Sequence, residues 1–116
     1  MLEKKQRVLG RDRSETLTTA ANLALLLSRQ GKHAEAVEIE REVLVQKTRL
    51  LGAEHKETLI SASNLAFSLS ACGQMAEAMQ LFRSTLALSR RALGPAHEYT
   101  QYVAECIGEL LSFAFA

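Results

Sequence analysis

Apolar residues in this chain recur at steps of three and four positions, the spacing that places side chains on one face of an α-helix. Within residues 15–29 the recurring positions are Leu17, Ala20, Leu23, Ala24 and Leu27. A second run lies in residues 36–44, at Ala36, Ile39, Val43 and Leu44. Charged residues fall mostly between the members of the second run. The pattern predicts two amphipathic helices, each of which needs a neighbour to cover its apolar side.

The two-helix pattern returns after 42 residues. Residues 9–50 and residues 51–92 align without a gap and are identical at 18 of 42 positions. Among the matches, Leu9-Gly10 returns as Leu51-Gly52 and Leu93-Gly94, and Asn22-Leu23-Ala24 returns as Asn64-Leu65-Ala66. Self-similarity at a fixed period is the sequence signature of a repeat array.

Glycines mark the ends of the predicted helices, where a left-handed residue terminates a helix. They fall at two places in each unit, in the middle (Gly31, Gly73) and at the ends (Gly10, Gly52, Gly94). We therefore predict one all-α domain of antiparallel helix pairs, with about two full repeats and partial repeats at both ends. Its parts are the end of a preceding second helix (1–8), a first repeat (9–50), a second repeat (51–92) and the first helix of a third repeat (93–116).

These residues resemble a tetratricopeptide repeat, a helix pair with small residues at its close contacts and a glycine in its turn. The long unit, with Leu-Gly, a loop histidine, Thr-Leu and Asn-Leu-Ala in order, is similar to the repeats of kinesin light chains and their relatives. The resemblance implies helix pairs stacked as a right-handed superhelix, or α-solenoid. It also implies a non-catalytic scaffold without a cofactor, which binds a peptide segment of a partner protein in its concave groove.

The same resemblance places the first helix of each unit along the concave surface. Residues of these helices that lie opposite the helix contacts are our candidates for peptide binding. They are Thr18, Asn22, Leu25, Arg29, Ile60, Ser63, Asn64, Phe67, Tyr102 and Glu109.

Five of these candidates suggest how a peptide is held. Asn22 and Asn64 offer a donor and an acceptor together, which suits the backbone of an extended peptide. The alternative is structural, with each amide bonding a neighbouring helix. Arg29 can pair with an acidic group of the ligand, and Phe67 and Tyr102 can receive an apolar anchor. Core packing is the alternative for Phe67.

The last predicted helix carries a second candidate surface, for self-association. Its apolar residues have no following helix to cover them, whereas terminal repeats normally present a polar outer face. They are Leu110, Leu111, Phe113 and Phe115. The alternative function is therefore a structural spacer or self-association segment of a larger repeat-containing protein, which forms a homo-oligomer through this helix.

Composition and charge narrow the function classes. Apolar residues make up 47% and charged residues 23%, which is typical of a folded chain and excludes a disordered one. A net charge of +1 provides no overall field to attract nucleic acid or an anionic membrane. The first residues are too polar for a signal peptide, and no apolar run reaches the roughly 18 residues of a membrane span. We expect a cytoplasmic protein that binds neither nucleic acid nor membrane.

No residue cluster in the sequence predicts catalysis or a metal site. His55 and His97 occupy the same loop position in successive units, so a helix pair separates them. Adjacent helix axes lie about 8–10 Å apart, whereas zinc requires each nitrogen at about 2 Å. Cys72 and Cys106 lie within apolar helical patterns and are interpreted as buried free thiols.

Charged residues also lie on the second predicted helix of the first unit. Glu38, Arg41 and Glu42 are interpreted as local charge pairs on a solvated face. Glu40 differs from them, because it occupies a position that is large and apolar in the related repeats. Phe82 fills that position in the next unit.

Overall fold

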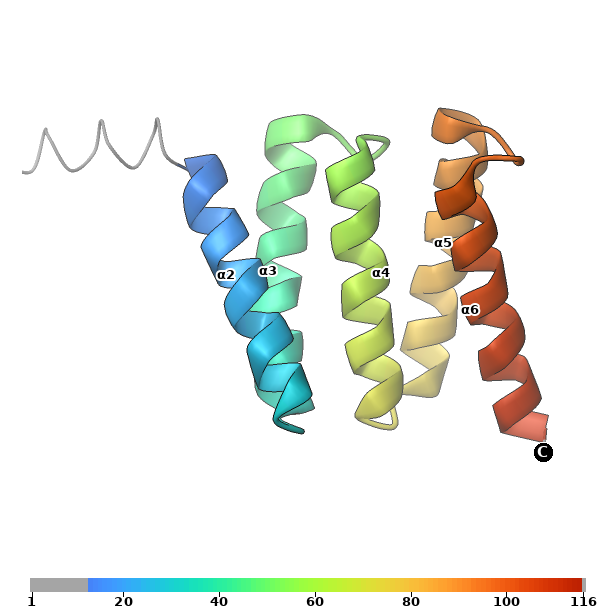
Figure 1. The fold of residues 1–116 in the computed structure, drawn as a ribbon, viewed down its shortest axis with the longest axis horizontal. Helices are drawn as coiled ribbons and strands as arrows, with labels where there is room; N and C mark the ends of the chain where they lie inside the picture. The colour runs from blue at the N-terminus through green and yellow to red at the C-terminus, as the bar shows by residue number, and fades with distance from the viewer. Residues whose placement is uncertain (1–12, 116) are drawn as a thin grey trace, which may run out of the picture.

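The computed structural model describes residues 13–115, together with the side chains of residues 15–112. Within this part of the chain it forms five helices, coloured from blue to red in Figure 1. They are α2 (Arg13–Arg29), α3 (His33–Leu51), α4 (Lys56–Ala71), α5 (Met75–Leu93) and α6 (Glu98–Phe115). The predicted all-α fold is confirmed. The helix end predicted for residues 1–8 lies outside the described residues.

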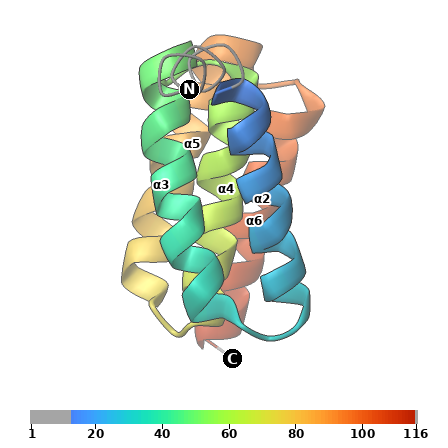
Figure 2. The same cartoon turned by 90° about the vertical axis from the view of Figure 1, so that its left-hand side faces the viewer.

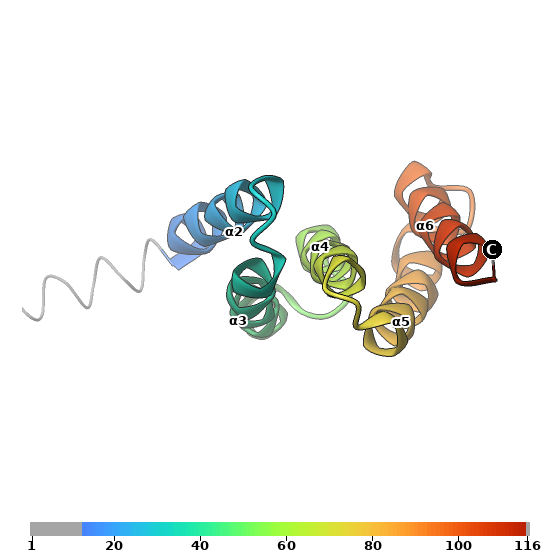
Figure 3. The same ribbon diagram turned by 90° about the horizontal axis from the view of Figure 1, so that it is seen from below.

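Consecutive helices run in opposite directions and pack against each other in chain order (Figure 1). The first helices of the pairs, α2, α4 and α6, form one side of the array, and α3 and α5 form the other (Figure 3). Because α4 is set back between α2 and α6, these three helices make the inner side of a curve (Figures 2 and 3). None of the described helices has the length and apolar character needed to cross a membrane.

Gly31 and Gly73 end the first helix of each pair. Both have a positive φ, 83° and 86°, which a residue without a side chain adopts at little cost. After α4, the Gln74 N–H donates to the carbonyl of Leu69 at 2.9 Å, and the Gly73 N–H donates to Ser70 at 3.0 Å. The turn at Gly31 has the same two bonds. This pattern satisfies carbonyls at the helix end and reverses the chain tightly, so the two helices of a pair lie antiparallel.

The recurring histidine begins the first helix of the next pair. His55 Nδ1 accepts a hydrogen bond from the backbone N–H of Glu57 at 3.1 Å, and His97 Nδ1 accepts one from Tyr99 at 3.0 Å. Each ring satisfies one of the N–H groups that a helix start leaves without a partner. Capping of α4 and α6 therefore explains why histidine recurs. Among the described residues, no group of three or more His, Cys, Asp or Glu side chains is arranged to hold a metal ion.

Alanines set the distance between the helices. Four of them have no exposed surface at all: Ala24, Ala36, Ala66 and Ala78. Neighbouring backbones approach closely at these points, and larger side chains fill the space between them. One buried cluster contains Val37, Leu65, Leu69 and Ala78, and a second contains Ala66, Phe82 and Val103.

A carboxyl group interrupts the packing of α3 against α4. Glu40 is only 5% exposed, and its Oε1 atom has no hydrogen-bond partner among the described residues. Burial raises the pKa of this carboxyl group, and a hydrogen bond with the buried Ser68 lowers it by less. In the next pair the corresponding residue is Phe82, which is 2% exposed and packs among apolar side chains. Glu40 is thus a polar defect in a largely apolar interface.

An ion pair joins the second helices of successive pairs. The Arg41 guanidinium donates two hydrogen bonds to the Glu77 carboxylate, at 2.6 and 2.9 Å. This finding corrects the interpretation of Arg41 as part of a local charge pair with Glu38 and Glu42, because its partner lies on α5. The planar guanidinium matches both carboxylate oxygens, which favours this contact. Exposed pairs contribute only about 0.2–1 kcal/mol, so this one adds little to the stability of the array.

Candidate functional site

The inner side of the array is built from equivalent positions of α2, α4 and α6. These helices run in the same direction and repeat after 42 residues, so side chains 42 positions apart lie in rows across them. The rows are Thr18, Ile60 and Tyr102; Asn22, Asn64 and Cys106; and Leu25, Phe67 and Glu109. All the predicted peptide-binding residues belong to these rows except Arg29 and Ser63.

Large apolar and aromatic side chains in these rows are open to solvent. Leu25 is 41% exposed, Ile60 36%, Phe67 57% and Tyr102 50%. Single exposed apolar residues are ordinary, but four on one side of three neighbouring helices form a surface suited to binding. The exposure of Phe67 also argues against the alternative that this residue packs in the core.

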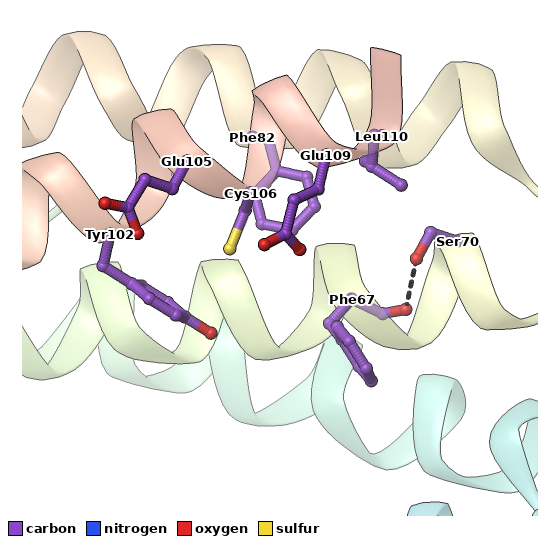
Figure 4. A pocket seen from close by; sticks show the side chains of 8 residues that line it. All are labelled: Phe67, Ser70, Phe82, Tyr102, Glu105, Cys106, Glu109 and Leu110. Carbon is purple, nitrogen blue, oxygen red and sulfur yellow. Dashed lines mark hydrogen bonds between the residues drawn. The ribbon is translucent and has the colours of Figure 1, made fainter. Parts of the chain in front are cut away.

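Between α4 and α6 the inner side deepens into a pocket of about 300 Å³, which we call the α4–α6 pocket (Figure 4). Its lining residues are Phe67, Ser70, Phe82, Tyr102, Glu105, Cys106, Glu109 and Leu110. Phe67 and Ser70 come from α4, Phe82 reaches the pocket from α5, and the others come from α6. The pocket therefore combines aromatic rings with carboxylates and a thiol.

Tyr99 of α6 fixes the spacing between α4 and α6. Its hydroxyl donates a hydrogen bond to the backbone carbonyl of Leu59 at 2.8 Å and contacts the hydroxyl of Ser63. Burial raises the pKa of Tyr99 to about 12, so this hydroxyl keeps its proton at neutral pH. Ser63 is 4% exposed at this contact. The expectation that Ser63 faces the groove is corrected accordingly, because Tyr99 covers it.

The two asparagines occupy equivalent positions of α2 and α4, in the row that continues to Cys106 of the pocket lining. Asn22 is exposed and Asn64 is half-buried. Within the described part of the chain neither amide is hydrogen bonded, so the bond to a neighbouring helix that the structural alternative requires is not seen there. Both amides keep a donor and an acceptor available. Arg29 lies exposed in the last turn of α2, where a cation also interacts favourably with the helix dipole.

Two titratable groups of the α4–α6 pocket, the Cys106 thiol and the Tyr102 hydroxyl, have raised pKa values. Burial raises the pKa of the Cys106 thiol, a hydrogen bond with Tyr102 lowers it, and the charges of Glu109 and Glu105 raise it again. Burial also raises the pKa of the Tyr102 hydroxyl. Both groups therefore stay protonated at neutral pH, whereas a nucleophilic cysteine requires the thiolate.

Four of the lining residues were not among the predicted site residues: Ser70, Phe82, Glu105 and Cys106. Glu105 follows Tyr102 by three positions and precedes Glu109 by four, so helical spacing places it on the same stripe of α6. Cys106 stands in the row of the asparagines. Phe82 gave no such signal, because it is a core residue of α5 whose ring also borders the inner side.

The residues predicted for self-association separate into two groups. Leu110 is half-buried and lines the α4–α6 pocket, whereas Leu111 is 36% exposed and is not part of that lining. The side chains of Phe113 and Phe115 lie outside those that the structure describes.

Helix pairs stacked in register, with equivalent residues in rows along a curved inner side, define the α-solenoid class of repeat proteins. The family model for Tetratricopeptide repeat matches residues 16–57 and 58–99, which is most of the chain. This chain belongs to the tetratricopeptide repeat family. Repeats of this family generally mediate protein–protein interaction and are typically non-catalytic, so the chain is a protein-interaction scaffold. The predicted repeat boundaries, 9–50 and 51–92, stay a prediction.

Two crystal structures with kinesin light chain-like repeats have the same fold. One is from Podosopora anserina and has nearly identical TPR-like repeats, with 25% sequence identity and a TM-score of 0.77. The other is a single-substitution variant of it with the same identity and score. Each similarity covers 85% of this chain but 47% of that chain, so this chain spans less than half the length of these relatives. Among curated proteins, none matches the sequence.

Proposed function

We propose that this scaffold binds an extended peptide segment of a partner protein along its inner side. The observation that carries the proposal is the α4–α6 pocket, which is flanked by the exposed rings of Phe67 and Tyr102. Asn22 and Asn64 support the proposal by their positions, which are equivalent to that of Cys106 in the pocket lining. A segment that crosses from α2 to α6 therefore meets backbone-binding groups and then a pocket for one of its side chains.

The two kinds of group have different tasks. Amides satisfy the backbone of an extended segment without requiring a particular sequence. A side chain seated in a pocket supplies most of the binding energy, since a few anchor residues dominate most interfaces. The pocket at α6 accordingly selects the ligand, and the amide row holds it.

Phe67→Ala is expected to weaken peptide binding by about 30-fold, because the loss of an aromatic anchor costs about 2 kcal/mol. The ligand for this test is a peptide selected by the chain from a random library displayed on phage. Its affinity for the wild-type protein and the variant is measured by fluorescence anisotropy. The fold should survive the change, because the Phe67 side chain is 57% exposed.

Val45→Ala is the matched control. Val45 is 45% exposed and lies on α3, which is not one of the three inner helices. This variant should bind the selected peptide with wild-type affinity. If Phe67→Ala also binds like the wild type, the α4–α6 pocket is not the anchor site and the proposal fails.

A second candidate function, self-association through α6, is favoured by the likeness between α6 and α4. The α4 residues Ala62, Ala66 and Leu69 are buried against neighbouring helices, at 7%, 0% and 0% exposure. Their α6 counterparts are exposed, because no described helix covers that face. They are Ala104, Gly108 and Leu111. We propose a second copy of the chain as the molecule that covers this face.

Light scattering across a concentration series tests this candidate. The wild-type chain should form a dimer as its concentration rises, and Leu111→Glu should remain a monomer with unchanged helix content by circular dichroism. Burial of one leucine side chain contributes about 1.5–3 kcal/mol, so the substitution should weaken the dimer by about 10- to 100-fold. A wild-type chain that is monomeric at every concentration contradicts self-association.

A further inference from the structure

Charge is distributed unevenly around the α4–α6 pocket. Helix α6 carries Glu98, Glu105 and Glu109 and has no lysine or arginine between residues 98 and 115. Helix α4 has one basic residue, Lys56, at its first position. The net charge of +1 for the whole chain therefore conceals an acidic last helix.

Two of these carboxylates belong to the pocket itself. Glu105 and Glu109 are four positions apart on α6, and Figure 4 shows both side chains on the side of α6 that borders the pocket. Neither carboxylate has an ion-pair partner within the described part of the chain. Three carboxylates elsewhere are each paired with a lysine or an arginine: Glu54, Glu57 and Glu77.

The unpaired carboxylates act on the space between α4 and α6. Like charges four positions apart destabilise a helix by about 0.2–0.5 kcal/mol, and no described cation relieves this pair. Burial is the largest cause of the raised pKa of the Cys106 thiol in the same pocket, and the charges of Glu109 and Glu105 raise this pKa further. A field that opposes a new negative charge favours a positive one. The α4–α6 pocket is therefore electrostatically suited to a cation.

The remaining lining suits the other parts of a basic side chain. Aromatic faces such as those of Phe67 and Tyr102 attract a cation that comes within about 6 Å. Apolar surface from Phe82 and Leu110 can cover the methylene stem of lysine or arginine, which packs against apolar groups while its charged head stays polar. The pocket thus offers an apolar part and an acidic, aromatic part to one ligand group.

We propose that the α4–α6 pocket receives an arginine or lysine side chain of the partner segment, with its cationic head at Glu105 and Glu109. The partner is therefore a basic peptide segment. This inference rests on the proposed function, because it requires a segment bound along the inner side. Arginine is favoured over lysine, since its planar guanidinium stacks on an aromatic ring and donates to a carboxylate with two parallel hydrogen bonds.

The test begins with peptides that the wild-type chain selects from the random phage library. Their affinity is then measured for the wild type and for the double variant Glu105→Gln/Glu109→Gln. Wild-type selections should be enriched in arginine and lysine. Their affinity for the double variant should fall by about 10- to 100-fold, because hydrogen bonds between charged groups are replaced by neutral ones. Added salt should weaken binding to the wild type and have much less effect on the double variant.

Two further variants make the test specific. Glu35→Gln/Glu38→Gln removes the same charge from exposed positions of α3 and should change the affinity by less than about twofold. Glu105→Lys/Glu109→Lys reverses the charge of the pocket and should select acidic peptides in place of basic ones.

The possible failures are distinguishable. In one outcome the wild type selects peptides without basic residues that bind Phe67→Ala more weakly than the wild type. In that case the proposal of a basic side chain in the pocket is overturned, while binding along the inner side stands. The proposal of a basic side chain at Glu105 and Glu109 is also overturned if basic peptides bind the double variant Glu105→Gln/Glu109→Gln as tightly as they bind the wild type. If no peptide is selected, or if Phe67→Ala binds every selected peptide normally, the proposed function itself is overturned and the inference with it.

Discussion

Glu40→Leu is expected to stabilise the protein at neutral pH by about 1–3 kcal/mol, measured by urea unfolding followed by circular dichroism. The wild-type side chain is 5% exposed, and one of its carboxyl oxygens has no partner among the described residues. Leucine removes this unpaired polar group and fills the same interface with apolar atoms. The following pair shows that an apolar residue fits there, because Phe82 occupies the corresponding position.

The pH dependence of this effect identifies its cause. Burial raises the pKa of Glu40 in the folded protein above the value of about 4.3 expected in the unfolded chain. Between these two values the folded protein binds more protons, so wild-type stability falls as the pH rises through this window. Below the window the carboxyl group is protonated in both states. The advantage of Glu40→Leu should therefore shrink as the pH is lowered through this window and level off below about 4.

Glu40→Gln is the matched control, because it keeps the size and the hydrogen bond to Ser68 but does not titrate. Its stability relative to the wild type should change with pH as that of Glu40→Leu does, without the added gain from apolar packing. If both variants are less stable than the wild type at neutral pH, the carboxylate is well satisfied in the folded protein and the interpretation of Glu40 as a defect is contradicted.

Phe82→Ala is expected to destabilise the protein by about 3–5 kcal/mol, measured by the same urea unfolding. The Phe82 ring is 2% exposed and packs with Ala66 and Val103, so its removal leaves a cavity where α4, α5 and α6 meet. A loss of this size is a large share of the roughly 5–15 kcal/mol that stabilises a typical domain.

Phe67→Ala removes the same ring from an exposed position and is the control for this effect. It should change the free energy of unfolding by no more than about 0.5 kcal/mol, in contrast to its expected effect on peptide binding. Within one pocket, Phe82→Ala should therefore affect mainly the free energy of unfolding, and Phe67→Ala mainly the affinity for the peptide. Equal unfolding free energies for the two variants would show that Phe82 does not contribute to the core as its burial indicates.

Much of the fold could be predicted from the sequence because the 42-residue period and the helical spacing agree with each other. Leu59, Leu65 and Leu69 recur from the first unit and are all buried in α4. The same period brings Phe67 and Tyr102 to the inner side, since translation by one repeat preserves the face of a helix. The site positions that recur with the 42-residue period could therefore be predicted from the sequence.

The contacts that could not be predicted come from residues that differ between the repeats or that reach from one helix pair to the next. Tyr99 stands where the other units have Glu15 and Glu57, so comparison of the units gave no sign that it crosses to α4 and buries Ser63. The contact of Arg41 with α5 likewise depends on how successive pairs stack, which spacing within one helix does not determine. Side-chain contacts between repeats required the three-dimensional arrangement.

The hydrogen bond from Tyr99 to the backbone of α4 also makes the inner side mechanically asymmetric. Between α4 and α6 this bond links the two helices one turn before Tyr102, the first α6 residue of the pocket lining, and a link that is already made reduces the ordering that a ligand must impose. In α4 the equivalent position is Glu57, whose carboxylate pairs with Lys47 of α3 and does not reach across to α2. The same position of the repeat therefore joins two first helices in one unit, α4 and α6, and joins α4 to the second helix of the preceding pair in the other.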